Sequence, residues 1–275
     1  MKITIVGLGL IGASIARALQ GKAYLTGIDT NTDSIKKGLK DGIIVEGDHS
    51  LSLAATSDLV VIALPVGEIV ETALGLIDHL KRGTVITDTG STKSHIVSRV
   101  IASWPWFVGS HPIAGSEFSG YDAARADLFR SGVSVITPSA STEGYCIEVV
   151  KRLWQMCGAQ TFEMSPEKHD AVMASISHLP HLLSFVFMHL ARDLNNVSNL
   201  FGKAFTDFTR IAGSDPVIWR DIFMDNKQHI MPRIEQYLQA LKHIQSLIAD
   251  NREQELEELL RVYMKTRRSL YEYPG

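Results

Sequence analysis

The sequence has few cysteines and no excess of positive charge, and each shortage excludes a class of protein. Its two cysteines, Cys146 and Cys157, do not form a CxxC motif, so neither a disulfide framework nor a cysteine-based metal site is indicated, and we expect a reducing compartment. Lysine and arginine number 27 against 30 aspartates and glutamates, a net charge of −3, which argues against a nucleic-acid partner because such binding needs a basic face. The longest apolar run, 59–67, has the length of a strand, so no membrane partner is expected.

The first residues resemble a secretion signal only superficially. Met1-Lys2 is followed by an apolar stretch that ends near Ala16-Arg17-Ala18, as in a signal peptide. Three glycines at fixed spacing lie inside that stretch, and they fit a nucleotide-binding turn better. We therefore expect a soluble cytoplasmic protein.

Residues 1–164 alternate between strand-like and helix-like segments. Short runs rich in β-branched residues are separated by segments with helical apolar spacing, such as 11–19 and 33–39. The run 58–64 is apolar after its first residue, which is typical of a strand buried on both faces. A parallel sheet covered by helices on both sides is therefore predicted, with strands at 2–6, 24–29, 58–64, 84–88, 107–109, 133–137 and 160–164.

The pattern changes at Ser165-Pro166, where proline suits the first turn of a helix and serine suits its N-cap. No strand pattern follows. Apolar residues form one helical stripe over 230–248 and another over 256–263, which predicts two long helices joined by a short turn. We expect an α/β domain at 1–164, an all-α helical domain at 165–275, and a homodimer formed through the C-terminal helices.

A glycine-rich turn follows the first strand directly and begins the first helix. The GxGxxG pattern needs its first glycine for the tight turn, its second for the close approach of a pyrophosphate and its third for helix–strand packing. Asp29 ends the next strand, where a carboxylate can accept a hydrogen bond from a ribose 2′-hydroxyl and repel a 2′-phosphate. A plain glycine turn beside a surface aspartate is the alternative. The combination favours NAD over NADP, bound by Gly7, Leu8, Gly9, Leu10, Ile11, Gly12 and Asp29.

Two further turns carry polar residues directly after predicted strands. In the turn 88–93, DTGSTK, Ser91 is either a site residue or, like Thr92, the N-cap of the next helix. The segment 109–117, GSHPIAGSE, places His111 between glycines, where a neutral imidazole can accept a proton from a hydroxyl as hydride leaves its carbon. A purely structural role for His111 is the alternative.

The first helix after residue 165 carries polar residues on one face. At ~100° per residue, Asp170, Ser177 and His181 fall within about 40° of one another, with His178 at the edge of the stripe. Such a stripe on an otherwise apolar helix predicts a lined cleft, and Pro180 is expected to kink the helix there. A metal site is the alternative, but the spacing is not HExxH, so we expect no metal.

Arg210 lies in a polar segment, 207–216, that precedes Trp219. Its guanidinium can hold a substrate carboxylate through two parallel hydrogen bonds. A structural ion pair with Asp207 or Asp215 is the alternative.

Taken together, these segments closely resemble the prephenate dehydrogenase family of tyrosine biosynthesis, which includes members that use arogenate. The resemblance covers most of the chain in order, through GLGLIG, TDTGSTK, GSHPIAGSE, LF at 128–129, HD at 169–170, SHLPH and DFTRIAGSDPxxW. It implies a Rossmann dinucleotide-binding domain followed by a helical dimerisation domain. It also implies that His111 is the catalytic histidine with Ser91 as its helper at the ring hydroxyl, that Arg210 binds a carboxylate with Glu117 as gating partner, and that Ser116, Ser177, His178 and His181 line the substrate and nicotinamide site.

The implied reaction converts prephenate and NAD into 4-hydroxyphenylpyruvate, CO2 and NADH. The ring carbon that carries the hydroxyl gives hydride to the nicotinamide while its hydroxyl shares a proton with His111, and aromatisation drives loss of the carboxylate. Three alternatives stay open. They are an arogenate dehydrogenase, a non-catalytic NAD-sensing protein, and a β-hydroxyacid-type dehydrogenase, whose catalytic lysine has no match at Lys168 or Lys203.

Overall fold

The structure, a computed structural model, describes residues 1–115, 118–192, 194 and 198–272. It consists of two compact units, Met1–Lys227 and Gln228–Gly275. The first unit holds the whole sheet and the helices as far as residue 225, and the second consists of a helical hairpin. The boundary expected after residue 164 lies inside the first unit and stays a prediction.

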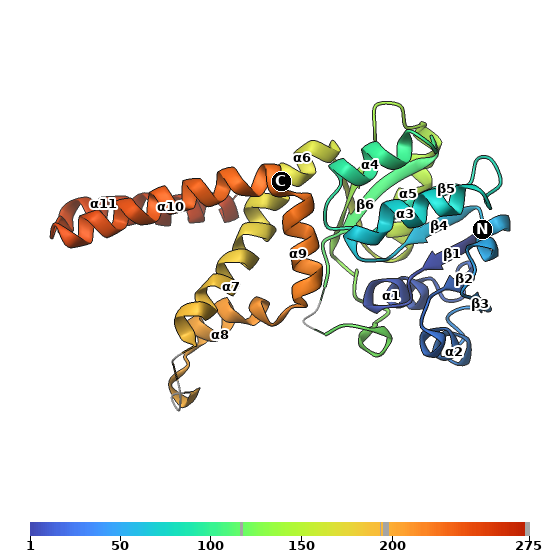
Figure 1. The fold of residues 1–275 in the computed structure, drawn as a ribbon, viewed down its shortest axis with the longest axis horizontal. Helices are drawn as coiled ribbons and strands as arrows, with labels where there is room; N and C mark the ends of the chain where they lie inside the picture. The colour runs from blue at the N-terminus through green and yellow to red at the C-terminus, as the bar shows by residue number, and fades with distance from the viewer. Residues whose placement is uncertain (116–117, 193, 195–197, 273–275) are drawn as a thin grey trace. The chain divides into compact units, whose positions relative to one another are not determined.

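One eight-stranded sheet organises the first unit (Figure 1). Its strands are β1 (Lys2–Val6), β2 (Tyr24–Ile28), β3 (Glu46–Asp48), β4 (Leu59–Ile62), β5 (Val85–Asp88), β6 (Phe107–Pro112), β7 (Val133–Thr137) and β8 (Gln160–Glu163). Their order is β3-β2-β1-β4-β5-β6-β7-β8, and all neighbours are parallel except β6 and β7. The predicted parallel sheet is confirmed from β1 to β6, whereas the antiparallel step to β7 and the short β3 were not predicted.

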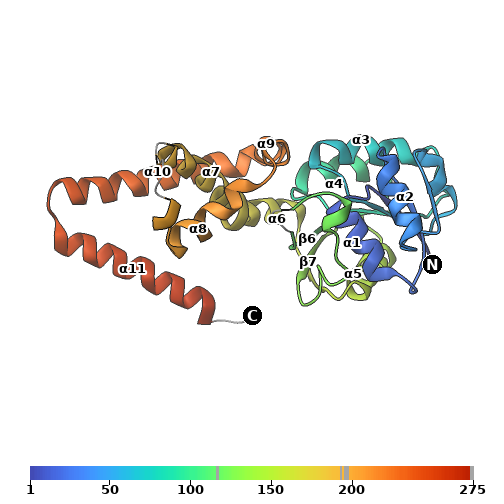
Figure 2. The ribbon, with the colours of Figure 1, turned by 90° about the horizontal axis from the view of Figure 1, so that it is seen from below.

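Helices cover both faces of the sheet, as the buried strand pattern requires (Figure 2). One apolar cluster joins the sheet to α1 (Leu10–Leu19), α2 (Thr32–Lys40) and α5 (Gly144–Met156). The other cluster joins it to α3 (Val66–Ile77) and α4 (Ser94–Ile101). All four residues of β4 are buried, because both of their faces meet helices.

The last part of the first unit, residues 166–225, is helical and is called the helical half below. It comprises α6 (Pro166–Met173), the π-helical segment η3 (Ala174–His178), α7 (Leu179–Ala191), α8 (Lys203–Thr209), the 3-10 turn η5 (Arg210–Gly213) and α9 (Pro216–Asp225). Ser165 caps α6, with its hydroxyl accepting the N–H of Lys168, and Pro166 occupies the first turn as predicted. α6 packs against α4, and α9 packs against α3.

The irregular segment is η3, just before Pro180, and it includes Ile176, whose carbonyl the ring of Pro180 would meet in a regular helix. A π-helical turn inserts an extra residue into the helical repeat, so a wheel drawn at ~100° per residue loses its phase there. The predicted stripe is therefore interrupted at η3, so Asp170 and His181 do not lie on one helix face.

The continuous helical stretch Pro166–Ala191 has the length and mean hydropathy, 1.5, of a membrane span, although 22% of that window is buried in the fold. This candidate membrane span was not predicted from the sequence, because polar residues interrupt the apolar residues along the stretch. His169, Asp170 and His178, in the first part of this stretch, make hydrogen bonds inside the first unit, whereas Ser184 alone is buried among residues 179–191 of α7.

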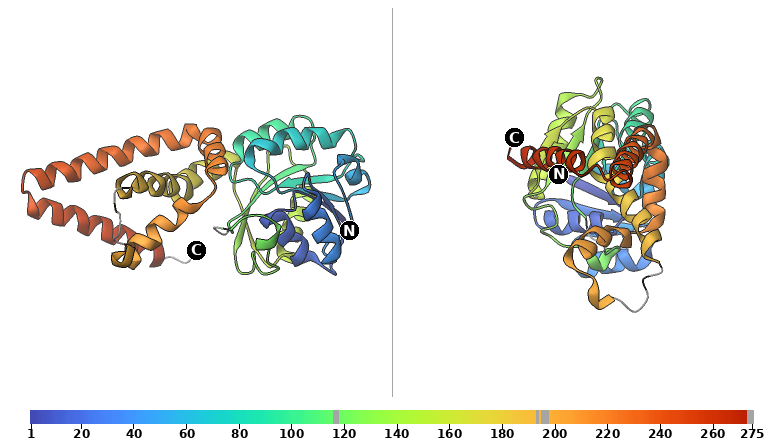
Figure 3. Two further views of the ribbon diagram at one scale, coloured as in Figure 1. Left: turned by 60° about the horizontal axis from the view of Figure 1, so that its bottom comes forward. Right: turned by 90° about the vertical axis from the view of Figure 1, so that its left-hand side faces the viewer.

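The second unit is the predicted pair of long helices, α10 (Lys227–Ala249) and α11 (Glu253–Glu272) (Figure 3). The turn between them places Asn251 at φ 54°, a left-handed conformation that asparagine adopts more readily than most residues. The apolar stripe of α10 includes Leu238, Leu241 and Ile248, which are 43%, 51% and 60% exposed. A single chain therefore leaves much of this stripe in contact with water.

Candidate active site

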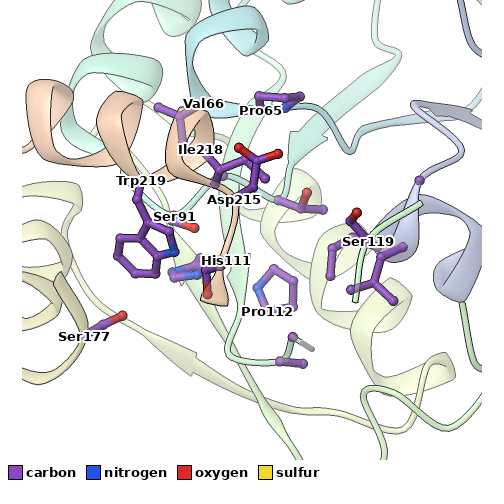
Figure 4. Close-up of a pocket in the computed structure, with 18 of the residues that line it drawn as sticks. Pro65, Val66, Ser91, His111, Pro112, Ser119, Ser177, Asp215, Ile218 and Trp219 are labelled. Atoms are coloured by element: carbon purple, nitrogen blue, oxygen red, sulfur yellow. The ribbon is translucent and has the colours of Figure 1, made fainter. Parts of the chain in front are cut away.

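The loops after β1, β4, β5 and β6 meet at the carboxyl edge of the sheet and line a cavity of about 720 Å³. β1 and β4 are neighbours whose following helices lie on opposite faces, and such a switch point is where α/β sheets bind ligands. The sheet contributes Gly9, Ile11, Pro65, Ser91 and His111, and the helical half contributes Ser177, His181, Arg210 and Trp219. Figure 4 shows His111, Ser91, Trp219 and Ser177 around this space.

The three glycines of the first turn have separate structural roles. Gly7 has φ 92°, and a Cβ there would lie 2.4 Å from the carbonyl oxygen of Ala63. A Cβ on Gly12 would lie 1.8 Å from the carbonyl oxygen of Gly7, so the helix could not pack this close with any other residue. A Cβ on Gly9 would meet nothing within 4 Å, and Gly9 lines the cavity. The open space beside Gly9, at the start of α1, fits a dinucleotide pyrophosphate.

Some residues around the glycine turn line the cavity, and others hold the turn in place. The side chain of Leu8 is fully buried, and its backbone N–H donates to Asp29 Oδ2 at 2.6 Å. Asp29 Oδ1 accepts the N–H of Asn31 at 2.7 Å, so the carboxylate is fixed beside the glycine turn. Leu10 and Ile11 line the cavity, whereas Asp29 lies outside its lining. This placement fits a contact to the ribose rather than to the reacting end of the cofactor.

His111 lies at the end of β6, where it pairs with Val135 of β7 and lines the cavity. Its Nδ1 is 2.9 Å from Nε2 of His169, and the two rings meet edge to face. Burial, with His169 and Lys93 nearby, holds the pKa of His111 well below its ordinary value of 6.5. The ring is therefore neutral at pH 7 and able to accept a proton.

Ser91 lines the cavity near His111, but it does not cap the next helix (Figure 4). The N-terminus of α4 has no side-chain cap of its own. The carboxylate of Asp170 takes that place, accepting the N–H of Lys93 and of Ser94 at 2.8 Å each. The alternative that Ser91 or Thr92 serves as the N-cap is therefore wrong, because a helix far along the chain supplies it.

His181, Arg210 and Ser177 line the part of the cavity that the helical half provides. Nδ1 of His181 donates to the carbonyl oxygen of Ser177 at 2.9 Å, and the ring of Trp219 stacks on His181 with centroids 3.6 Å apart. Burial lowers the pKa of His181, with a further effect from Arg210, so its Nε2 is an acceptor.

The acidic neighbours of Arg210 make other contacts. Asp207 pairs with Lys203 at 2.8 Å, and Asp215 caps α9 by accepting the N–H of Val217. Arg210 has at least one further interaction, so neither its expected role at a carboxylate nor the structural alternative is decided by these two contacts.

His178 lies behind the cavity wall rather than in it. Its side chain is 1% exposed and does not line the cavity. Nδ2 of Asn226 donates to its Nδ1 at 2.9 Å and to the carbonyl oxygen of Asp170 at the same distance, and burial lowers the pKa of His178 to about 4. The substrate contact expected of His178 stays a prediction, because its buried side chain lies outside the cavity lining, which includes Ser177 and His181. Two other predicted contacts, Ser116 and Glu117, lie outside the described residues.

Three residues that matter here were given no role from the sequence. Lys93 is fully buried and binds the carboxylate of Asp88 and, at 3.0 Å, the carbonyl oxygen of Ser110, next to His111. Trp219 orients His181, and His169 contacts His111. For Lys93, the signal in the sequence was a charged residue only a few positions after a predicted buried strand. No group of three or more possible metal ligands occurs among the described residues.

Gly9 and Gly12 offer a matched test of the glycine turn. We expect Gly12→Ala to lower the free energy of unfolding by about 1–3 kcal/mol or more, because its Cβ meets backbone, and Gly9→Ala to leave it unchanged or slightly higher. Gly9→Ala is expected to weaken NADH binding at least about tenfold, because a pyrophosphate must approach that Cα closely. Denaturant unfolding and NADH fluorescence titration measure the two effects. Wild-type NADH affinity in Gly9→Ala would contradict the assignment.

Two family models together span most of the chain. The one described as prephenate dehydrogenase, nucleotide-binding domain, matches residues 15–163, and the one described as prephenate dehydrogenase, dimerization domain, matches residues 165–262. The prephenate dehydrogenase of Bacillus subtilis (strain 168) is 36% identical over 281 residues, which cover 96% of this chain and 73% of that protein.

Solved structures agree with this match. The crystal structure of prephenate dehydrogenase from A. aeolicus, in complex with hydroxyphenyl propionate and NAD+, gives a TM-score of 0.91 at 35% identity and covers 98% of both chains. The arogenate dehydrogenase of Synechocystis gives 0.85 at 29% identity, over 98% of this chain and 100% of that one. The chain belongs to the prephenate dehydrogenase family.

Proposed function

We propose that this chain catalyses the NAD-dependent oxidative decarboxylation of prephenate to 4-hydroxyphenylpyruvate, a step of tyrosine biosynthesis. The observation that carries the proposal is a neutral histidine, His111, in the wall of a cavity that also contains Gly9 and Arg210. Family membership supports the reaction, and the A. aeolicus relative, which binds NAD+ and hydroxyphenyl propionate, supports both ligand classes.

The cofactor end of the cavity suits NAD. Gly9, Leu10 and Ile11 would hold the pyrophosphate at the start of α1, and Asp29 would accept a hydrogen bond from the adenosine ribose. A 2′-phosphate beside Asp29 would be repelled, which favours NAD over NADP. NAD+ supplies the hydride acceptor when bound.

The chain's own residues orient the substrate and accept its proton. His111 would accept the proton of the ring hydroxyl, with Ser91 as a second hydrogen-bonding partner at that hydroxyl. Arg210 would bind a carboxylate of the substrate in a two-point contact, and His181 and Ser177 would line the same region. Departure of the ring carboxylate as CO2 leaves an aromatic ring, so orientation and proton acceptance are the main tasks of the protein.

An arogenate dehydrogenase is the second candidate, favoured by the likeness to the Synechocystis structure. Arogenate carries an amine where prephenate carries a keto group, so the same ring chemistry applies to both.

The direct test is NADH formation at 340 nm with prephenate or arogenate and with NAD+ or NADP+. We expect turnover with prephenate and NAD+, and we expect His111→Asn to lower kcat by about 100-fold or more while KM changes little. His79→Asn, an exposed histidine on the same domain, is the control and should retain wild-type kcat. A wild-type enzyme inactive on prephenate, or an unchanged kcat in His111→Asn, would contradict the proposal.

Arg210→Ala is expected to raise KM for prephenate by about 30-fold or more, because a charged two-point hydrogen bond is lost, with a smaller change in kcat. Arg220→Ala removes an exposed arginine of α9 that pairs with Asp221, and it should leave KM unchanged. Steady-state kinetics on the two variants compare them directly. Equal KM in both would remove Arg210 from carboxylate binding.

A homodimer through the C-terminal helices belongs to the same proposal. The family model that matches residues 165–262 is described as a dimerization domain. α11 has no buried residue, and its Leu260, Val262 and Tyr263 are 50%, 56% and 44% exposed, which is the state expected of a helix that lacks its partner. Light scattering at twice the 30.3 kDa chain mass supports the dimer, and a monomer at micromolar concentration contradicts it.

A cytoplasmic location completes the proposal. Cys146 and Cys157 are both buried and free, which suits a reducing compartment. Recovery of the protein in the membrane fraction after cell lysis would contradict it.

A further inference from the structure

Behind His111, a line of buried side chains leads away from the cavity. Nδ1 of His111 is 2.9 Å from Nε2 of His169, and Nδ1 of His169 is 2.8 Å from Oδ1 of Asp170. His169 is fully buried and Asp170 is 2% exposed, so water does not compete for these bonds. Asp170 is fixed in turn by the two backbone N–H groups at the start of α4.

The donors and acceptors along this line fit together in one way only. Burial raises the pKa of Asp170, but the hydrogen bonds from His169 and Ser94 outweigh it and bring the pKa below its ordinary value of 3.8. Ionised Asp170 only accepts, so Nδ1 of His169 must carry its proton. Burial lowers the pKa of His169 despite Asp170, so this ring is neutral and its Nε2 is an acceptor. Nδ1 of His111 must therefore be the donor.

We propose that His169 and Asp170 are positioning residues that hold His111 as its Nδ1–H tautomer and leave the lone pair on Nε2 for the substrate hydroxyl. The inference rests on the proposed function, because it assigns His111 the task of accepting that proton. In the other tautomer, Nε2 would carry a hydrogen and could not accept one. The line also restricts rotation of the His111 ring, because Nδ1 has a fixed partner.

The hydrogen bonds from His111 through His169 to Asp170 also affect the positive charge that His111 acquires. Once His111 has taken the proton, Nδ1–H still donates to His169, and the Asp170 carboxylate lies behind that ring. The other charged or titratable groups facing the pair are Lys93 with its partner Asp88, and His178. The positive charge of Lys93 disfavours a second positive charge on His111, and the pairing of Lys93 with Asp88 weakens this repulsion.

His169 is the better position to test, because Asp170 also caps α4 and its loss would disturb the fold. His169→Gln can place Oε1 near the former position of Nε2 and accept from His111, whereas His169→Met has a similar volume and offers no comparable acceptor. We expect His169→Met to lose about 100-fold or more in kcat and His169→Gln to stay within about 10-fold of wild type. Both variants should keep wild-type NADH affinity and KM.

Kinetics with prephenate and NAD+ separate the possible outcomes. Equal kcat in wild type and His169→Met overturns the inference, as does a Gln variant as slow as the Met variant, which indicates packing rather than a hydrogen bond. An inactive wild type would instead contradict the proposed function.

A spectroscopic readout does not depend on turnover. In ¹⁵N-histidine-labelled wild type at pH 7, with His111 assigned by comparison with His111→Asn, we expect a protonated Nδ1 and an unprotonated Nε2. A protonated Nε2 on His111 overturns the inference whether or not the enzyme is active, and so does the same Nδ1–H tautomer persisting in His169→Met.

Discussion

The carboxylate of Asp170 holds the active site of this protein together. It accepts the N–H groups of Lys93 and Ser94 at the start of α4, and so it fastens α6 to the carboxyl edge of the sheet. The anion suits the positive end of a helix dipole, which favours its ionised state. The same carboxylate accepts from His169, which contacts His111. One side chain thus links α6 to the start of α4 and, through His169, bears on which nitrogen of His111 is available.

The polar groups beneath the cavity are costly to bury, and the buried charges among them, Lys93, Asp88 and Asp170, have specific partners. Lys93 and Asp88 are both fully buried, and Ser110 accepts from Lys93 through its carbonyl and donates to Asp88 through its backbone N–H. Breaking such a pair by removing one partner typically costs about 3–5 kcal/mol, since the other charge stays buried. These buried groups lie next to His111, and burial is the main cause of its lowered pKa, which keeps the histidine neutral and able to accept a proton from the substrate.

Local patterns predicted most of the fold, and contacts distant in sequence account for most of what was missed. Strand β4 was predicted from an apolar run, and the glycine turn before α1 from the spacing of its glycines. Both signals lie within a few residues. β3 has the sequence EGD, with no apolar residue that would indicate a strand. The residue pattern of β7 does not depend on whether it runs parallel or antiparallel to β6, so its direction could not be predicted. The Asp170 cap joins residues 77 apart. The π-helical turn that contains His178 interrupts a repeat that looks regular in the sequence. The role of Ser91 at the ring hydroxyl came from family resemblance, that of Arg210 came from its chemistry as well, and both stay proposals.

The central claim is that a neutral His111, kept so by burial, accepts the substrate's proton, and the pH dependence of kcat/KM for the wild-type enzyme tests it most directly, because kcat/KM reports the ionisation of the enzyme before substrate binds. Burial lowers the pKa of His111 from 6.5, so the neutral form persists as the pH falls, and protonation stops the reaction only below that lowered pKa. The account predicts that kcat/KM for prephenate, measured in short assays at saturating NAD+, stays level from pH 8 to pH 6.5 and declines only on a single ionisation clearly below 6.5. An acid limb with an apparent pKa at or above 6.5 would contradict it, because His111 would then be largely protonated at the pH where the enzyme is expected to work.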